Sequence, residues 1–171
     1  MLWAATAPGG PAFFPVFLGV PATLVMGLIW VGRLVAWKTD EARSNKRRWL
    51  VAPTMVIVAG LLFSSGLPLK ARFGFARDDF NAVVADLEPQ GSVDDWVRLE
   101  VPSRIGSYEI YAAYQVGSGV IFYEINGSGF ANDGGFAYLP DGPDVRLESG
   151  SFERPSFRSL GGDWYSWSAS W

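Results

Sequence analysis

The chain has 171 residues, of which 14 are basic and 17 acidic, and it contains no histidine and no cysteine. This composition excludes disulfides, thiol nucleophiles, histidine bases and the common zinc ligands, and no cofactor is expected. From Lys70 onward there are 8 basic and 15 acidic residues. That balance argues against nucleic acid as a partner, because binding phosphates requires clustered positive charge.

Two long uncharged stretches occupy the N-terminal part of the chain. No charged side chain occurs in residues 1–32 or in residues 49–69. A helix of about 20 apolar residues is long enough to cross the roughly 30 Å hydrocarbon core of a bilayer. The sequence therefore predicts two membrane-spanning helices, over residues 13–37 and 49–69, joined by a loop over residues 38–48.

The loop between the two stretches is basic. Its positive residues are Lys38, Arg43, Lys46, Arg47 and Arg48. Short loops rich in Lys and Arg stay in the cytoplasm, so both termini are expected outside it, together with a domain over residues 70–171. Arginine outnumbers lysine 11 to 3, which suggests a GC-rich genome, and no organelle targeting signal is visible. We therefore expect the plasma membrane of a bacterium.

Two other interpretations of the uncharged stretches remain to be weighed. A cleaved signal peptide begins with a positively charged segment, and no basic residue precedes Arg33. A soluble protein would have to bury both stretches, and a domain of this size could not hide two uncharged helices of such length. Both alternatives are less consistent with the sequence than a membrane hairpin.

Small residues recur every four positions in both predicted spans. They are Gly19, Thr23 and Gly27 in the first span, and Gly60 and Ser64 in the second. This spacing lets helix backbones approach closely, so we expect the two helices to pack together. Docking of a partner's helix on the same residues is the alternative.

The outer domain begins with a helical pattern and continues with strand patterns. Residues 78–87 have apolar side chains three and four positions apart, which predicts one short amphipathic helix. Residues 97–101, 109–116 and 120–125 alternate or are β-branched and aromatic, which predicts strands. Asn126-Gly127, Asp133-Gly134 and similar pairs predict turns between them.

The last residues show the clearest alternation. Tyr165, Trp167, Ala169 and Trp171 share one face of a predicted strand, and serines occupy the other. Aromatic side chains on one face of a sheet normally form its core. The predicted fold is two transmembrane α-helices plus an α+β extracytoplasmic domain, in which one short helix packs on an antiparallel β-sheet of about five to seven strands.

Residues 136–142, with the sequence FAYLPDG, resemble the strand and turn signature of TolB-like propeller repeats. A propeller needs roughly four or more blades, and hence several copies of its repeat. Only one copy occurs in this chain. The resemblance therefore implies a hairpin at Pro140–Pro143 and nothing about function.

Oxygen-bearing side chains gather in the expected turns. The acids among them are Asp133, Asp141, Asp144 and Asp163. Calcium accepts about six to eight oxygen ligands in flexible geometry, so these four are candidate metal ligands. Turns also select Asn and Asp for backbone reasons alone, which is the simpler explanation.

Three functions remain open at this point. The first is a non-catalytic membrane protein whose outer sheet binds or stabilises an envelope protein, and the lack of catalytic side chains favours it. The second is an envelope carbohydrate-binding module. Trp164 is its candidate ligand residue, because strict alternation points this side chain away from the aromatic face. The third is a metal-dependent enzyme, which requires the aspartates to converge on one cation.

Overall fold

The computed structural model describes residues 6–8, 13–36, 46–87, 96–128, 132–143 and 153–170. These residues form three helices and a seven-stranded antiparallel sheet. The helices are α1 (Phe13–Ala36), α3 (Lys46–Ser65) and α4 (Leu67–Asp86). The strands are β1 (Val97–Leu99), β2 (Arg104–Ile105), β3 (Tyr108–Val116), β4 (Gly119–Glu124), β5 (Asn132–Tyr138), β6 (Glu153–Gly161) and β7 (Trp164–Ser170).

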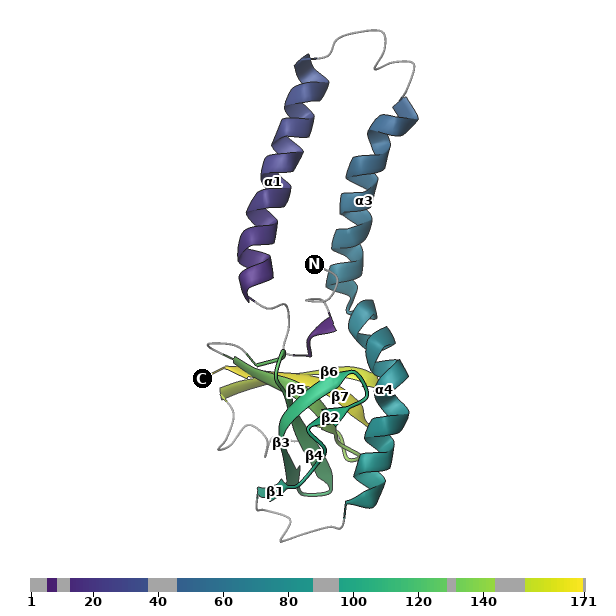
Figure 1. Ribbon diagram of the computed structural model, residues 1–171, viewed down its shortest axis with the longest axis vertical. Helices are drawn as coiled ribbons and strands as arrows, with labels where there is room; N and C mark the ends of the chain where they lie inside the picture. Colours follow the sequence, from purple (N-terminus) through teal and green to yellow (C-terminus); the bar gives the residue numbers. More distant parts are fainter. Residues whose placement is uncertain are drawn as a thin grey trace.

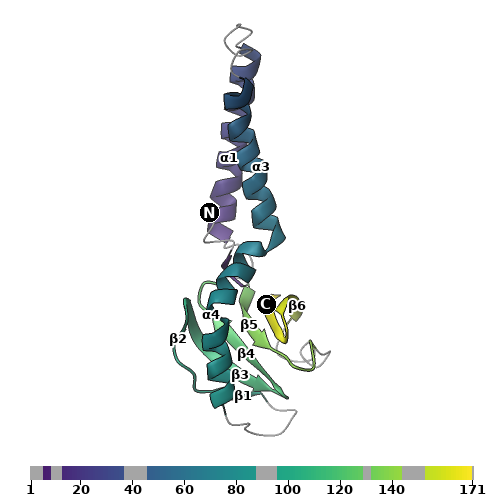
Figure 2. The same cartoon turned by 90° about the vertical axis from the view of Figure 1, so that its right-hand side faces the viewer.

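Helices α1 and α3 lie alongside each other and extend away from the sheet (Figures 1 and 2). Their described apolar side chains are exposed, up to 71 % at Leu28 in α1 and 66 % at Met55 in α3. Over the residues with described side chains, no single helix is long and apolar enough to cross a membrane. The segments Pro53–Leu62 and Leu67–Asp86 reach that length and composition only as a pair, with a bend of 52° between them.

Gly27 and Gly60 do not bring the backbones of these two helices into contact. A Cβ atom added at Gly27 or at Gly60 would meet no atom within 4 Å. The predicted close packing of the helices is therefore wrong at these two positions. Gly19 and Ser64 are not among the residues with described side chains.

A break at Gly66 separates α3 from α4. Gly66 has a φ of 68°, a backbone conformation that residues with a Cβ atom rarely adopt. Pro68 then lies in the first turn of α4, where its missing N–H costs nothing. The prediction of a helix continuing to Leu69 is therefore wrong, and so is the predicted start of the domain helix at Asp78.

Helix α4 covers one face of the sheet, and the main core lies between them. Its buried residues Leu69, Phe73, Ala76 and Phe80 are spaced four, three and four apart, so they form one stripe facing the sheet. The ring of Phe73 stacks on that of Phe136 with centroids 4.9 Å apart. The sequence-based prediction of a helix packed on an antiparallel sheet is confirmed.

The strand order is β1-β3-β4-β5-β7-β6, and β2 also pairs with β3. β7 thus lies inside the sheet between β5 and β6, which confirms that the last predicted strand is integral to it. β6 is an edge strand, and its register with β7 shifts twice, between Glu153 and Ser156 and between Ser159 and Gly161. Neither β2 nor β6 had been predicted.

Two predicted turns have different outcomes. The amide of Gly142 donates to the carbonyl of Leu139 (3.0 Å), and Gly142 has a φ of 80°, so the turn after FAYLPDG is present. It does not close a hairpin between neighbouring strands, because β5 pairs with β7 and the next described strand, β6, pairs only with β7. The predicted turn at Asp133-Gly134 is wrong, since both residues lie within β5.

Candidate interaction surface

The face of the sheet opposite α4 carries a second set of aromatic residues, called the aromatic face below. Its centre is buried and includes Ile121, Ala137 and Trp167. Around that centre lie partly buried rings, namely Trp96, Tyr111, Tyr114, Tyr123, Phe157 and Tyr165. The prediction that this face of the last strand forms a core is confirmed for Trp167 and Ala169, which are buried, while Trp171 lies outside the described residues. Helix α4 covers the opposite side of the sheet.

A glycine at the middle of the aromatic face lets two aromatic residues meet. Strand register aligns Tyr123, Gly135 and Trp167 across β4, β5 and β7. The indole of Trp167 reaches over Gly135, donates from Nε1 to the carbonyl of Phe122 (3.1 Å), and contacts the Tyr123 ring edge-on with centroids 4.7 Å apart. Without a side chain at residue 135, this indole can lie flat against β5.

The exposed part of the aromatic face is a row of tyrosines beside one carboxylate. Tyr111 is 44 % exposed, and its hydroxyl donates to Asp133 Oδ1 at 3.1 Å and lies 3.2 Å from Ser128 Oγ. The rings of Tyr111 and Tyr114 each meet the Tyr123 ring edge-on, with centroids 5.6 and 5.5 Å apart. The row presents ring surface and hydrogen-bonding groups together.

The phenols of Tyr111 and Tyr123 remain protonated well above neutral pH. Burial raises the pKa of Tyr111, and the charge of Asp133 raises it further. Burial is also the main cause of the raised pKa of Tyr123, followed by Asp133. These side chains can therefore donate hydrogen bonds and offer ring faces, but they cannot serve as bases at neutral pH.

The predicted metal-site acids lie in different places. Asp133 is on the aromatic face, Asp141 accepts a hydrogen bond from the Ser118 hydroxyl (2.5 Å), and Asp163 is exposed in the turn between β6 and β7. Asp144 lies outside the described residues. Among the residues that are described, no three His, Cys, Asp or Glu side chains form a group that could hold a metal ion.

Trp164 lies in the main core. It faces away from Tyr165 and Trp167, as alternation predicted, but it is only 3 % exposed and packs among the aromatic side chains under α4. Its Nε1 donates to Asn81 Oδ1 on α4 (2.9 Å). The ring therefore has no free face on which a sugar could stack.

Sequence reasoning missed Tyr111 as a surface residue because strict alternation fails there. The register between β3 and β4 shifts between Ile110 and Ala112, which is a β-bulge or a similar irregularity. Such a shift lets Tyr111 and Ala112 both turn toward the aromatic face. A bulge leaves no clear pattern in a single sequence, whereas Tyr123 could have been assigned by alternation with Phe122.

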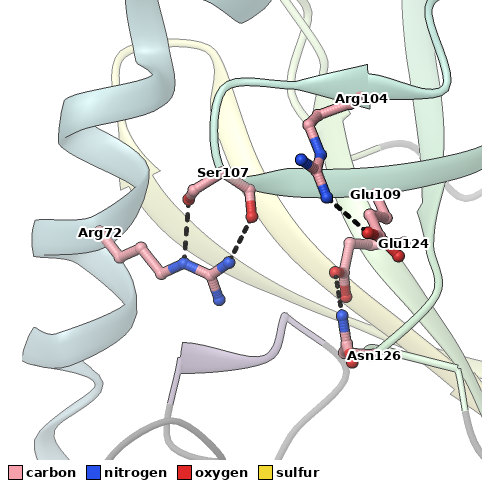
Figure 3. Close-up of polar contacts among 6 residues, drawn as sticks. All are labelled: Arg72, Arg104, Ser107, Glu109, Glu124 and Asn126. Carbon is pink, nitrogen blue, oxygen red and sulfur yellow. Dashed lines mark hydrogen bonds and ion pairs between the residues drawn. The ribbon is translucent and has the colours of Figure 1, made fainter.

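Glu124 is the one charged side chain that is fully buried in the described part of the chain. Its Oε1 accepts a hydrogen bond from Asn126 Nδ2 (2.9 Å, Figure 3), and its Oε2 accepts one from the amide of Gly127 (2.6 Å). Both oxygens are therefore used in fixing the turn that follows β4. The arrangement stabilises a loop and leaves no oxygen of this carboxylate directed at a substrate.

Comparison with known protein families, with curated proteins and with solved structures gave no match in any of the three searches. The function must therefore be inferred from the residues of this chain alone.

Proposed function

We propose that the protein is a non-catalytic membrane protein, anchored in the plasma membrane of a bacterium by α1 and α3. Both termini and the sheet domain lie outside the cytoplasm. The domain binds an envelope protein through the tyrosine row of its aromatic face. The half-exposed Tyr111, which contacts the Tyr123 ring and is hydrogen-bonded to Asp133, is the observation that carries the proposal.

The exposed apolar surface of α1 and α3 supports membrane anchoring. Leu24, Met26 and Leu28 on α1 are all more than half exposed, and so are Met55 and Leu61 on α3. Soluble monomers rarely expose contiguous apolar patches larger than a few hundred Å², because burying such surface is worth roughly 25 cal/mol per Å². A bilayer would remove this surface from water.

The arrangement of the helices fits a hairpin topology. The end of α1 and the start of α3, where the basic residues 46–48 occur, lie at the far end from the sheet (Figure 1). The acidic domain lies at the other end. This charge distribution agrees with a cytoplasmic loop and an outer domain.

Labelling of single cysteines will test this topology. Because the native chain has no thiol, cysteines at Ser44 and Ser149 can be labelled in intact cells without background. We expect an impermeant maleimide to label Ser149→Cys and to spare Ser44→Cys until the cells are permeabilised. The reverse pattern would place the domain in the cytoplasm. Equal labelling of both positions in intact cells would contradict the proposal that the chain is anchored in the membrane.

The composition of the tyrosine row supports a protein partner. Tyrosine and tryptophan are enriched at the centres of protein interfaces, where they bury large areas at little cost in conformational entropy. No ion pair to Asp133 is found among the described residues. A partner that brings a lysine or arginine to Asp133 would match both the rings and the charge.

A crosslinker placed in the tyrosine row will test the partner. We expect p-benzoylphenylalanine at position 111 to give one discrete adduct in native membranes at native abundance. Phe75 on α4 is the matched control, since it is an aromatic residue that is 91 % exposed on the other side of the sheet. Adducts of the same size at both positions, or none at 111, would contradict the proposal.

The carbohydrate module is the second candidate, and the half-exposed rings beside Asp133 are the observation in its favour. Sugars commonly stack on tyrosine and tryptophan rings and bond to carboxylates. Titration with cell-wall fragments should then quench tryptophan emission through Trp96, which contacts Tyr114 with ring centroids 5.9 Å apart. No quenching at millimolar concentrations would reject this candidate.

A further inference from the structure

Three segments that are distant in the sequence meet where the domain faces the helical hairpin. They are the short segment Thr6–Pro8 that precedes α1, the start of α4, and the turn between β2 and β3. Figure 1 shows the first of these, in purple, between the helices and the sheet. A single side chain of α4, Arg72, joins all three.

Arg72 uses its whole guanidinium group in this junction. Its Nε donates to the Ser107 hydroxyl (3.0 Å) and its Nη2 to the Ser107 carbonyl (2.6 Å), as Figure 3 shows. Its Nη1 donates to the Thr6 hydroxyl (3.0 Å). The planar group also lies over the Tyr108 ring, 4.1 Å from the centroid. An arginine suits this task because its donors have a fixed fork geometry.

The segment Thr6–Pro8 is held from its other side as well. Ala7 and Pro8 are buried. Gly127 leaves room for Pro8, because a Cβ atom at residue 127 would lie 2.9 Å from Pro8 Cγ. The same glycine is fixed by its bond to the buried Glu124. The segment Thr6–Pro8 is thus held between α4 and the turn after β4.

The turn at Ser107 is itself fixed on α4. Gly106 has a φ of 56°, and a Cβ atom there would lie 2.7 Å from the Cβ of Ala76. The Arg72 contacts therefore link Thr6 to a rigid turn and not to a movable side chain alone. The hydroxyl of Tyr108, whose ring lies under the guanidinium, is buried and finds no hydrogen-bond partner among the residues that the structure describes.

We propose that the hydrogen bonds of Arg72 to Thr6 and Ser107, called the clasp below, make α1 and the sheet domain move as one body. α4 follows α3 directly, so this junction connects both membrane helices to the sheet. The inference rests on the proposed membrane anchoring.

Distance measurements between spin labels will test the clasp. The full chain in lipid nanodiscs carries labels at Leu28→Cys on α1 and Arg98→Cys on β1, both exposed positions. We expect one narrow distance distribution in the unmodified background. Arg72→Gln and Thr6→Val should each replace it with a broad distribution, since each removes the bond between α4 and the segment before α1.

The matched control is Arg104→Gln. Arg104 is also an arginine near this end of the domain, but it pairs only with Glu109 on the neighbouring strand (2.7 Å) in an exposed ion pair. The control should keep the narrow distribution. A narrow distribution in Arg72→Gln or in Thr6→Val, with near-ultraviolet circular dichroism unchanged, would overturn the proposal. Thr6→Val leaves the sheet and α4 intact, so it decides the matter if Arg72→Gln does not fold.

A third label separates this inference from the membrane proposal. A spin label at Leu61→Cys on α3 reports collisions with oxygen, which concentrates in the bilayer, and with a water-soluble nickel complex. A water-exposed label at Leu61 would contradict the proposal that α3 lies in the membrane. A lipid-exposed label, together with an unchanged α1-to-sheet distance in Arg72→Gln and Thr6→Val, would contradict only the proposed role of Arg72.

Discussion

Replacing Gly135 with alanine is expected to destabilise the sheet domain by about 4 kcal/mol or more, which is at the extreme of single substitutions. A Cβ atom at this position would collide with the carbonyl oxygen of Phe122 on the adjacent strand. It would also lie 3.1 Å from Nε1 of Trp167, the atom that donates to the same carbonyl. The substitution must therefore separate β4 from β5 or displace the indole.

Thermal unfolding of the full chain in detergent, followed by near-ultraviolet circular dichroism, measures this effect. Gly74→Ala is the matched control, because Gly74 is exposed on α4 and a Cβ atom there would meet no atom within 4 Å. Alanine in a helix interior is favoured over glycine, so the control should gain about 0.5 to 1 kcal/mol. If Gly135→Ala melted at the wild-type temperature, the indole could not lie over residue 135 as described.

Deleting residues 167–171 is expected to unfold the whole sheet domain. The deletion removes most of β7, which pairs with β5 along one side and with β6 along the other. It also removes Trp167, one of the largest fully buried side chains. The aromatic face would lose its centre, and β6 would lose its only strand partner among those described.

Circular dichroism of the truncated chain should therefore show loss of the near-ultraviolet signal and of the strand contribution, while the helical signal persists. Trp167→Phe is the graded comparison, since it keeps one aromatic ring but removes the Nε1 bond to Phe122 and part of the buried indole. That variant should fold, with a loss of about 1 to 3 kcal/mol, because a buried carbonyl loses a partner. An unchanged spectrum in the truncated chain would show that β7 is dispensable.

Local patterns in the sequence predicted some of the regular elements. The predicted span over residues 13–37 corresponds to α1, and alternating or β-branched and aromatic runs located β3, β4 and β7 to within one or two residues. These signals are strong because each depends on neighbours in the sequence. The antiparallel sheet followed from them directly.

The break at Gly66 and the side covered by α4 could not be predicted in the same way. Gly66 lies in an apolar run in which glycines also occur within helices, for example at Gly60, so composition does not mark the break. Alternation shows which residues of β7 share a face, but both faces carry tryptophan. Whether Trp164 or Trp167 meets the helix depends on contacts with α4, which are distant in sequence.

The position of Asp133 beside the tyrosine row could not be predicted from the sequence either. Asp133 was singled out as an oxygen ligand, and the structure places it beside Tyr111, a residue 22 positions away that no motif connects to it. Their proximity depends on the pairing of β3, β4 and β5 and on the irregularity in β3. A single sequence contains no local signal for such a combination.

The two edges of the sheet have a consequence for how the protein behaves at high concentration. β1 is only three residues long, and β6 carries Pro155 and two register shifts. Proline cannot donate a ladder hydrogen bond, and short or irregular borders offer a poor template for another chain. Neighbouring copies are therefore hindered from adding strands to one another, so crowding should not lead to fibrils.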